Sequence, residues 1–266
     1  GSWMSEGAKF ADLQTRVISA FIMLLIGGVA IWMGGYVFSA VIVCAVGAMH
    51  WELGRMLTPL SMQAQWFSAL TSVISIIWLL TTDSLIEQVV ILTVATLLQR
   101  VYFHTVDRLG TLVSAGIIIG ALLLIYVRNN VGIIVALWIV GIVVITDIAG
   151  YFVGRIVGGA KFWPTLSPKK TWSGIVGGWL GAMVLSYVLV HLGYVILPLK
   201  VALALALGLS FASQMGDIVE SGLKRAAGVK DSSDLIPGHG GVMDRFDGLI
   251  GASLVYAVFL GVLTWV

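Results

Sequence analysis

The chain has 266 residues, of which 59% are hydrophobic and only 11% are charged, and its formal net charge is +2. Its mean hydropathy of +1.03 excludes an ordinary soluble domain, because a domain of this size cannot bury so much apolar surface, and it indicates a polytopic membrane protein. The small net charge predicts no nucleic-acid partner, and the single Cys44 excludes a disulfide framework within the chain.

The N-terminal segment, residues 1–16, is expected to lie outside the membrane. We expect residues 1–3, ahead of Met4, to be a cloning remnant. The first apolar run has basic residues before it but no Ala-x-Ala cleavage site, so we expect an uncleaved anchor. Residues 17–266 contain no repeat and no long linker, which predicts a single transmembrane domain.

Nine apolar runs approach the roughly 20 residues that a membrane-spanning helix needs. They lie near residues 17–34, 35–51, 63–82, 84–99, 109–127, 130–147, 174–197, 199–216 and 248–266. Because backbone polar groups in lipid need partners within the protein, the predicted fold is an all-α bundle of about nine transmembrane helices.

The basic residues are divided unequally between the two sides of such a bundle. If all nine runs span the membrane, 13 of the 15 Lys and Arg residues lie on the side of the N-terminus, and only Arg128 and Lys200 lie opposite. The positive-inside rule then places the N-terminus in the cytoplasm, together with two long polar loops, 148–173 and 217–247.

The loop 217–247 contains ten of the chain's 28 charged residues. Four polar residues share one face if the preceding helix continues past Gly216, namely Asp217, Glu220, Ser221 and Lys224. Asp244 and Asp247 have a similar spacing at the start of the last span. Two helix ends can therefore direct carboxylates to one point, where a hard divalent cation would find oxygen ligands. We predict that Asp217, Asp244 and Asp247 bind metal and act in catalysis together with Lys224.

The rest of this loop combines cations with glycines. Arg225, Lys230 and Arg245 supply positive charge for phosphate groups, as does Lys224. Around His239, Gly240 and Gly241 allow the backbone to approach a ligand closely. His239 could contact the ligand, carry a proton or support the loop. We predict that this segment, with Ser221, binds substrate; a solvated loop whose charges pair among themselves is the alternative.

The earlier polar segment carries a matching set of residues. Asp147 ends the sixth apolar run, and LSPKKTWSG (residues 166–174) places Lys169, Lys170 and Thr171 beside a helix start. Lysines and hydroxyl groups at such a place can hold phosphate oxygens, so we predict that these four residues bind substrate. The Gly-xxx-Gly pairs in residues 174–181 indicate close helix packing instead.

A polar cluster ends the second run. His50, Trp51, Glu52 and Arg55 are expected to form an anchor at the membrane interface rather than a site. Glu87 and Gln88 enter an apolar run, and we expect them to face protein.

Residues 221–247, SGLKRAAGVKDSSDLIPGHGGVMDRFD, resemble the signature of the phosphatidate cytidylyltransferases, also called CDP-diacylglycerol synthases. The matching positions are Ser221, Lys224, Arg225, Lys230, Asp231, Pro237, His239, Gly240, Gly241, Asp244, Arg245 and Asp247. The upstream segments TDIAGYFVGR and LSPKKTWSG also resemble the family. Ser173 departs from it, because the family commonly has an acid after the Trp of the second segment.

The resemblance implies a membrane enzyme of phospholipid biosynthesis that converts CTP and phosphatidate to CDP-diacylglycerol and pyrophosphate. It implies a magnesium-dependent site, with a second cation such as K⁺ as an option, and it makes Asp217 and Asp244 correspond to the family's metal-binding acids. It also implies a multi-pass protein of the bacterial inner membrane with its site in the cytoplasm. The sequence leaves the oligomeric state open, with a homodimer as one option.

Two other functions remain open on the sequence. A CTP-dependent polyprenol or phytol kinase would also have acidic and basic loops, but it would release CDP. An ion-coupled transporter would place its charges near the middle of the membrane, on broken helices.

Overall fold

The computed structural model describes residues 6–58, 61–102 and 108–265. Nine α-helices lie within these ranges: α1 (Glu6–Met33), α2 (Gly35–Leu57), α3 (Met62–Leu79), α4 (Leu85–Tyr102), α5 (Arg108–Tyr126), α6 (Ile133–Val157), α7 (Trp172–His191), α8 (Leu199–Ala226) and α9 (Met243–Trp265). A π-helical turn, η1 (Val127–Val131), joins α5 to α6. An antiparallel hairpin of β1 (Lys161–Trp163) and β2 (Ser167–Thr171) precedes α7.

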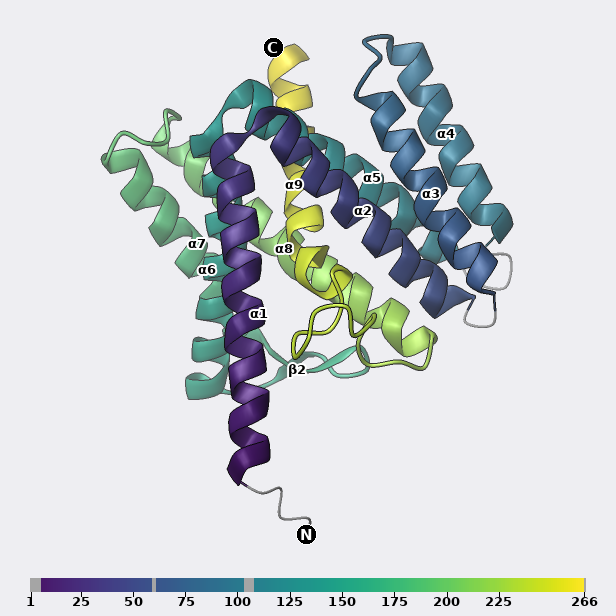
Figure 1. Ribbon diagram of the computed structural model, residues 1–266. Coiled ribbons are helices and arrows are strands. Elements are labelled where there is room, and N and C mark those ends of the chain that lie inside the picture. The colour runs from purple at the N-terminus through teal and green to yellow at the C-terminus, as the bar shows by residue number, and fades with distance from the viewer. Residues whose placement is uncertain (1–5, 59–60, 103–107, 266) are drawn as a thin grey trace.

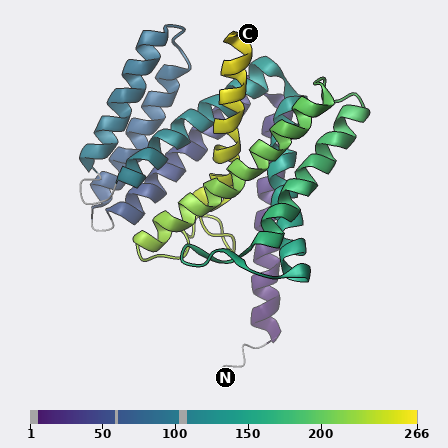
Figure 2. The same ribbon diagram turned by 180° about the vertical axis from the view of Figure 1, so that it is seen from behind.

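The predicted all-α membrane bundle is confirmed. Seven helices of the described part are long and apolar enough to cross a bilayer, namely α1, α2, α3, α5, α6, α7 and α8. The expected spans at α4 and α9 are also helical, although they are not among these seven. Figures 1 and 2 show the N-terminus and the β-hairpin at one end of the bundle and the C-terminus at the other.

Two helices extend further than their apolar sequence indicates. α6 continues past Asp147 to Val157, and α8 continues past Gly216 to Ala226. The expectation that 148–173 and 217–247 are loops is therefore wrong for the first part of each segment. Hydropathy marks where the apolar surface ends, whereas backbone hydrogen bonds continue the helix beyond that point.

Glycines bring α6 and α7 into close contact, as the Gly-xxx-Gly pairs predicted. A Cβ on Gly174 would lie 2.7 Å from the carbonyl oxygen of Gly150, and one on Gly177 would lie 2.6 Å from Cβ of Val153. Because only glycine leaves room for this approach, the start of α7 lies against the end of α6.

The helices α8 and α9 cross equally closely. A Cβ on Gly216 would lie 2.3 Å from the carbonyl oxygen of Asp247, and one on Gly251 would lie 2.3 Å from that of Ala212. This crossing brings the two acidic helix ends together, because Asp217 follows Gly216 directly and Asp247 is itself at the contact.

Buried polar side chains connect α2 to α5 and α3 to α4. His50 of α2 is fully buried, with Nε2 3.0 Å from Oγ of Ser114 in α5. Ser68 of α3 donates a hydrogen bond of 2.7 Å to Oε1 of Gln99 in α4. The expected interfacial anchor is therefore wrong for His50, whose ring lies inside the bundle, where a polar group needs a partner within the protein.

Candidate active site

The continuation of α8 places four polar residues on one face, as its sequence spacing indicated. Ser221 Oγ lies 3.4 Å from Oδ1 of Asp217, one turn away. Lys224 donates a hydrogen bond of 2.8 Å to Oε2 of Glu220, which is only 2% exposed. The face thus carries two acids and a cation where the helix leaves its apolar part.

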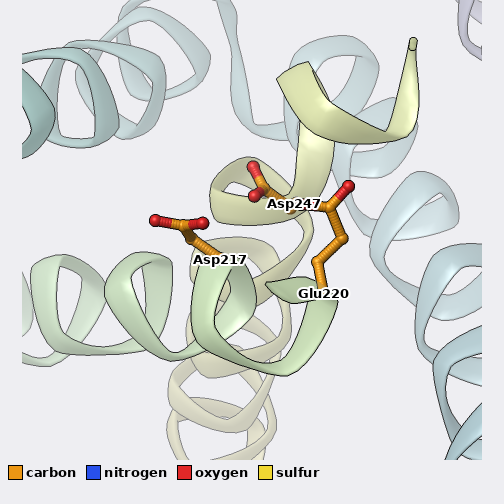
Figure 3. A group of neighbouring side chains, drawn as sticks. All are labelled: Asp217, Glu220 and Asp247. Carbon is orange, nitrogen blue, oxygen red and sulfur yellow. The ribbon is translucent and has the colours of Figure 1, made fainter. Parts of the chain in front are cut away.

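Three carboxylates from α8 and α9 converge beside the crossing of these helices. One oxygen each of Asp217, Glu220 and Asp247 lies within 4.8 Å of the others. Figure 3 shows Asp217 and Glu220 on neighbouring turns of α8, with Asp247 approaching them from α9. Oε1 of Glu220 has no hydrogen-bond donor among the described residues. Such a group of oxygens suits a hard divalent cation.

Asp244 lies in a different set of contacts. Its Oδ1 accepts a hydrogen bond from Lys224, and its Oδ2 accepts bonds from the backbone N–H of Ser232 (3.0 Å) and of Gly241 (2.8 Å). The hydroxyl of Ser232 donates another bond of 2.8 Å. Of the three acids predicted to bind metal, the structure thus groups Asp217 and Asp247 with Glu220 and pairs Asp244 with Lys224.

These contacts determine the ionisation of Asp244, which lies in the first turn of α9, ahead of the apolar sequence that begins at Gly248. Burial by itself raises the pKa of this carboxyl, but the hydrogen bonds from Lys224, Gly241 and Ser232 outweigh burial and lower its pKa to about 2. Asp244 is therefore a carboxylate at neutral pH and holds the side chain of Lys224.

The β-hairpin also contacts the group of three carboxylates. Lys170 of β2 forms an ion pair with Asp217. A cavity of about 520 Å³ opens beside this pair, and its lining includes the four substrate-binding candidates of the earlier segment, which are Asp147, Lys169, Lys170 and Thr171. Gly150, Tyr151 and Gly154, which follow Asp147 on α6, line it as well.

Thr171 also has a structural task. Its Oγ1 accepts a hydrogen bond of 3.2 Å from the N–H of Gly174 and so caps α7. Ser173, which departs from the family pattern, donates a bond of 2.6 Å to the carbonyl of Gly158. Thr171 therefore joins β2 to the start of α7, and Ser173 joins α7 to the C-cap residue of α6.

Residues 237–241, called the glycine-rich loop below, lie against Asp244. Gly240 has φ +81°, and a Cβ there would lie 2.9 Å from Oδ2 of Asp244. Arg245 holds the loop by donating two hydrogen bonds, of 3.1 and 2.7 Å, to the carbonyl of His239. Arg225 and Lys230 are exposed, and neither forms an ion pair within the described ranges. The structure thus groups Gly240, Gly241 and Arg245 around Asp244 and leaves two of the predicted cations facing solvent.

Glu52, like His50, does not belong to the expected interfacial anchor. It was expected at the membrane interface, but it is fully buried beneath the glycine-rich loop, where it accepts a hydrogen bond of 2.8 Å from the N–H of Val242. The available signal was an ionisable residue in an apolar helix, which is costly unless it is paired.

A second cavity, of about 490 Å³, reaches the acids from the apolar side. Its walls come mostly from apolar residues of α5, α8 and α9, such as Ile117 and Leu254. Glu220 and Asp247 contribute to the same lining. Glu220 and Asp247 thus line this apolar cavity, whereas Asp217 is connected to the first, polar cavity through its ion pair with Lys170.

The fold and this site define a polytopic helical membrane protein with carboxylates and lysines gathered at one end, an arrangement suited to phosphate chemistry. The chain belongs to the cytidylyltransferase family, whose pattern it matches over residues 14–263. It is 35% identical to the phosphatidate cytidylyltransferase of Brucella suis biovar 1 (strain 1330) over 264 residues, which cover 94% of this chain and 93% of the relative. It is 39% identical to the phosphatidate cytidylyltransferase of Bacillus subtilis (strain 168) over 150 residues, or 55% and 56% of the two chains.

Proposed function

We propose that the protein is a phosphatidate cytidylyltransferase, which forms CDP-diacylglycerol and pyrophosphate from CTP and phosphatidate. One observation carries this proposal: Glu220 and Asp247 line the apolar cavity, and Asp217 beside them forms an ion pair with Lys170 of the polar cavity. A reaction that joins a soluble nucleotide to a lipid needs both kinds of cavity at one reaction centre. The relatives named above support the same activity.

The charges of the two cavities suggest where each substrate binds. Lys169 and Lys170 supply positive charge in the polar cavity, which suits the triphosphate of CTP. The apolar cavity suits the acyl part of phosphatidate, whose phosphate would then lie near Glu220 and Asp247. With CTP in the polar cavity and phosphatidate in the apolar cavity, the lipid phosphate would lie next to the α-phosphorus of CTP.

The proposed step is an in-line displacement. A phosphate oxygen of phosphatidate attacks the α-phosphorus of CTP, and the bond from that phosphorus to the oxygen bridging to the β-phosphorus breaks, releasing pyrophosphate. The nucleophile is already an anion, so no strong base is needed. The obstacle is repulsion between two anions, which Lys170 and Lys224 reduce by holding positive charge beside the reacting phosphates.

Magnesium is the proposed cofactor, and the residues at the site fit it. Asp217, Glu220 and Asp247 offer carboxylate oxygens within 4.8 Å of one another, and Oε1 of Glu220 is free of hydrogen-bond donors among the described residues. When bound there, Mg²⁺ supplies charge neutralisation for the phosphates. For Asp244 to serve as a further ligand, its carboxylate must leave Lys224. A second cation such as K⁺ stays a prediction.

We further propose that the protein lies in the bacterial inner membrane with its site facing the cytoplasm. The 13-to-2 division of basic residues supports this orientation, which gives the site access to cellular CTP. Homodimer formation also stays a prediction, which a mass measurement in detergent can check.

Product analysis tests the reaction. The purified protein, given CTP, phosphatidate and Mg²⁺ in detergent, should release pyrophosphate and form CDP-diacylglycerol. Release of CDP with a polyprenol or phytol as acceptor would instead establish the lipid kinase. Absence of both reactions, with ion-dependent uptake into vesicles, would establish the transporter.

A further inference from the structure

Glu52 of α2 makes contacts that the proposed reaction does not explain. Its side chain is fully buried, and its Oε1 accepts hydrogen bonds from the hydroxyl of Ser233 (2.5 Å) and the N–H of Val242 (2.8 Å). Its Oε2 accepts a bond of 2.7 Å from the N–H of Met243. One carboxylate thus binds the middle and the last residue of the segment that connects α8 to α9, and also the first residue of α9.

Two of these donors belong to the start of α9. The first N–H groups of a helix have no partner within the helix, and a side chain just before the helix usually accepts from them. Here that position is Val242, whose side chain has no acceptor. Glu52 therefore caps α9 from another helix, and its negative charge is also favourable at a helix N-terminus.

The glycine-rich loop also packs closely against the carboxylate of Glu52. A Cβ on Gly241 would lie 2.4 Å from Oε1 of Glu52 and 2.0 Å from Oγ of Ser232. Asp244 binds Ser232 and Gly241, while Glu52 binds the next residue along in each case, Ser233 and Val242. Two acids, one from α2 and one from α9, thus hold the loop in place.

We propose that Glu52 is a positioning residue, which fixes the start of α9 and thereby the placement of Asp244 and Asp247 toward α8. It touches neither of these acids in the contacts above and acts through the backbone of residues 242 and 243. The catalytic consequence rests on the proposed function, whereas the structural part does not. A displacement of reacting groups by about 1 Å can reduce turnover about 100-fold. A substitution of Glu52 that shifts the start of α9 by this amount should therefore have a measurable effect on kcat.

The test uses Glu52→Gln in the full-length protein. Glutamine keeps the size of the side chain but replaces one acceptor oxygen by an NH₂ group, which cannot accept from the backbone N–H. Ser114→Ala is the matched control. It removes a buried hydrogen-bond partner of His50, which lies on α2 like Glu52, and it does not touch the segment that connects α8 to α9. Ser233→Ala removes only one of the three bonds and serves if the glutamine variant does not fold.

Hydrogen–deuterium exchange in detergent without ligands, thermal unfolding and steady-state kinetics are measured for each variant. In Glu52→Gln, amide exchange at residues 242 and 243 should rise about tenfold, as expected for a lost cap, while α5 and α7 exchange as in the wild type. The value of kcat should fall at least about tenfold, with KM for CTP within about twofold. Ser233→Ala should shift exchange at residues 242 and 243 and kcat less, and Ser114→Ala should leave both unchanged, although the loss of a buried hydrogen bond lowers its thermal stability.

Unchanged exchange at residues 242 and 243 would overturn the proposal, as would normal kcat in spite of faster exchange. Exchange that rises equally in all helices would assign Glu52 to general stability and would also overturn it. If the wild type itself forms no CDP-diacylglycerol, the proposed function fails, and the exchange measurement still decides whether Glu52 holds the start of α9.

Discussion

Gly216→Ala offers a direct test of the crossing between α8 and α9. The added Cβ would lie 2.3 Å from the carbonyl oxygen of Asp247 and 3.5 Å from Cα of Gly248. Ordinary contacts of a Cβ begin near 3.4 Å, so the two backbones would have to separate by about 1 Å, because a carbonyl group cannot rotate away as a side chain can. Asp247 would move away from Asp217 by a similar distance.

We expect this substitution to lower kcat about 100-fold, the usual consequence of a 1 Å displacement of reacting groups. Overpacking should also cost about 1–3 kcal/mol of stability. Gly208→Ala is the matched control, because it lies on the same helix and its Cβ would meet only Cγ1 of Val255, at 3.6 Å. The assay is pyrophosphate release with CTP and phosphatidate, normalised to folded protein. Equal kcat values for the two variants would refute the view that the crossing positions the carboxylates.

Three further predictions concern charge and orientation. Asp217→Asn should abolish turnover and leave the thermal unfolding profile close to wild type, because it removes a charge from the carboxylate group; near-normal activity at saturating Mg²⁺ would contradict this role. Lys224→Ala should reduce kcat much more than Lys200→Ala, since Lys224 contacts two acids of the site and Lys200 lies exposed at the opposite end; equal losses would show that the site is wrongly placed. A cysteine at Asp234 should resist a membrane-impermeant thiol reagent in intact cells, whereas one at Asn130 should react; the reverse pattern would invert the topology.

Much of this protein follows from its sequence, because lipid leaves a chain few options. Apolar runs of sufficient length must become helices, since the backbone finds no other hydrogen-bond partners in a bilayer. The spacing of Asp217, Glu220 and Lys224 on one helical face also follows from local periodicity. Helix ends were less predictable: α6 and α8 continue beyond their apolar parts, because backbone hydrogen bonding does not stop where hydropathy falls.

The relations between distant segments were decided by the tertiary structure alone. Glu52 and Met243 are 191 positions apart, and no local pattern indicates that a carboxylate at the end of one helix caps another. The pairing of Lys170 with Asp217 and the turn of Asp244 toward Lys224 depend on how the β-hairpin, α8 and α9 meet. The approach of Asp247 to the acids of α8 likewise depends on Gly216, which lets the backbones of α8 and α9 come so close.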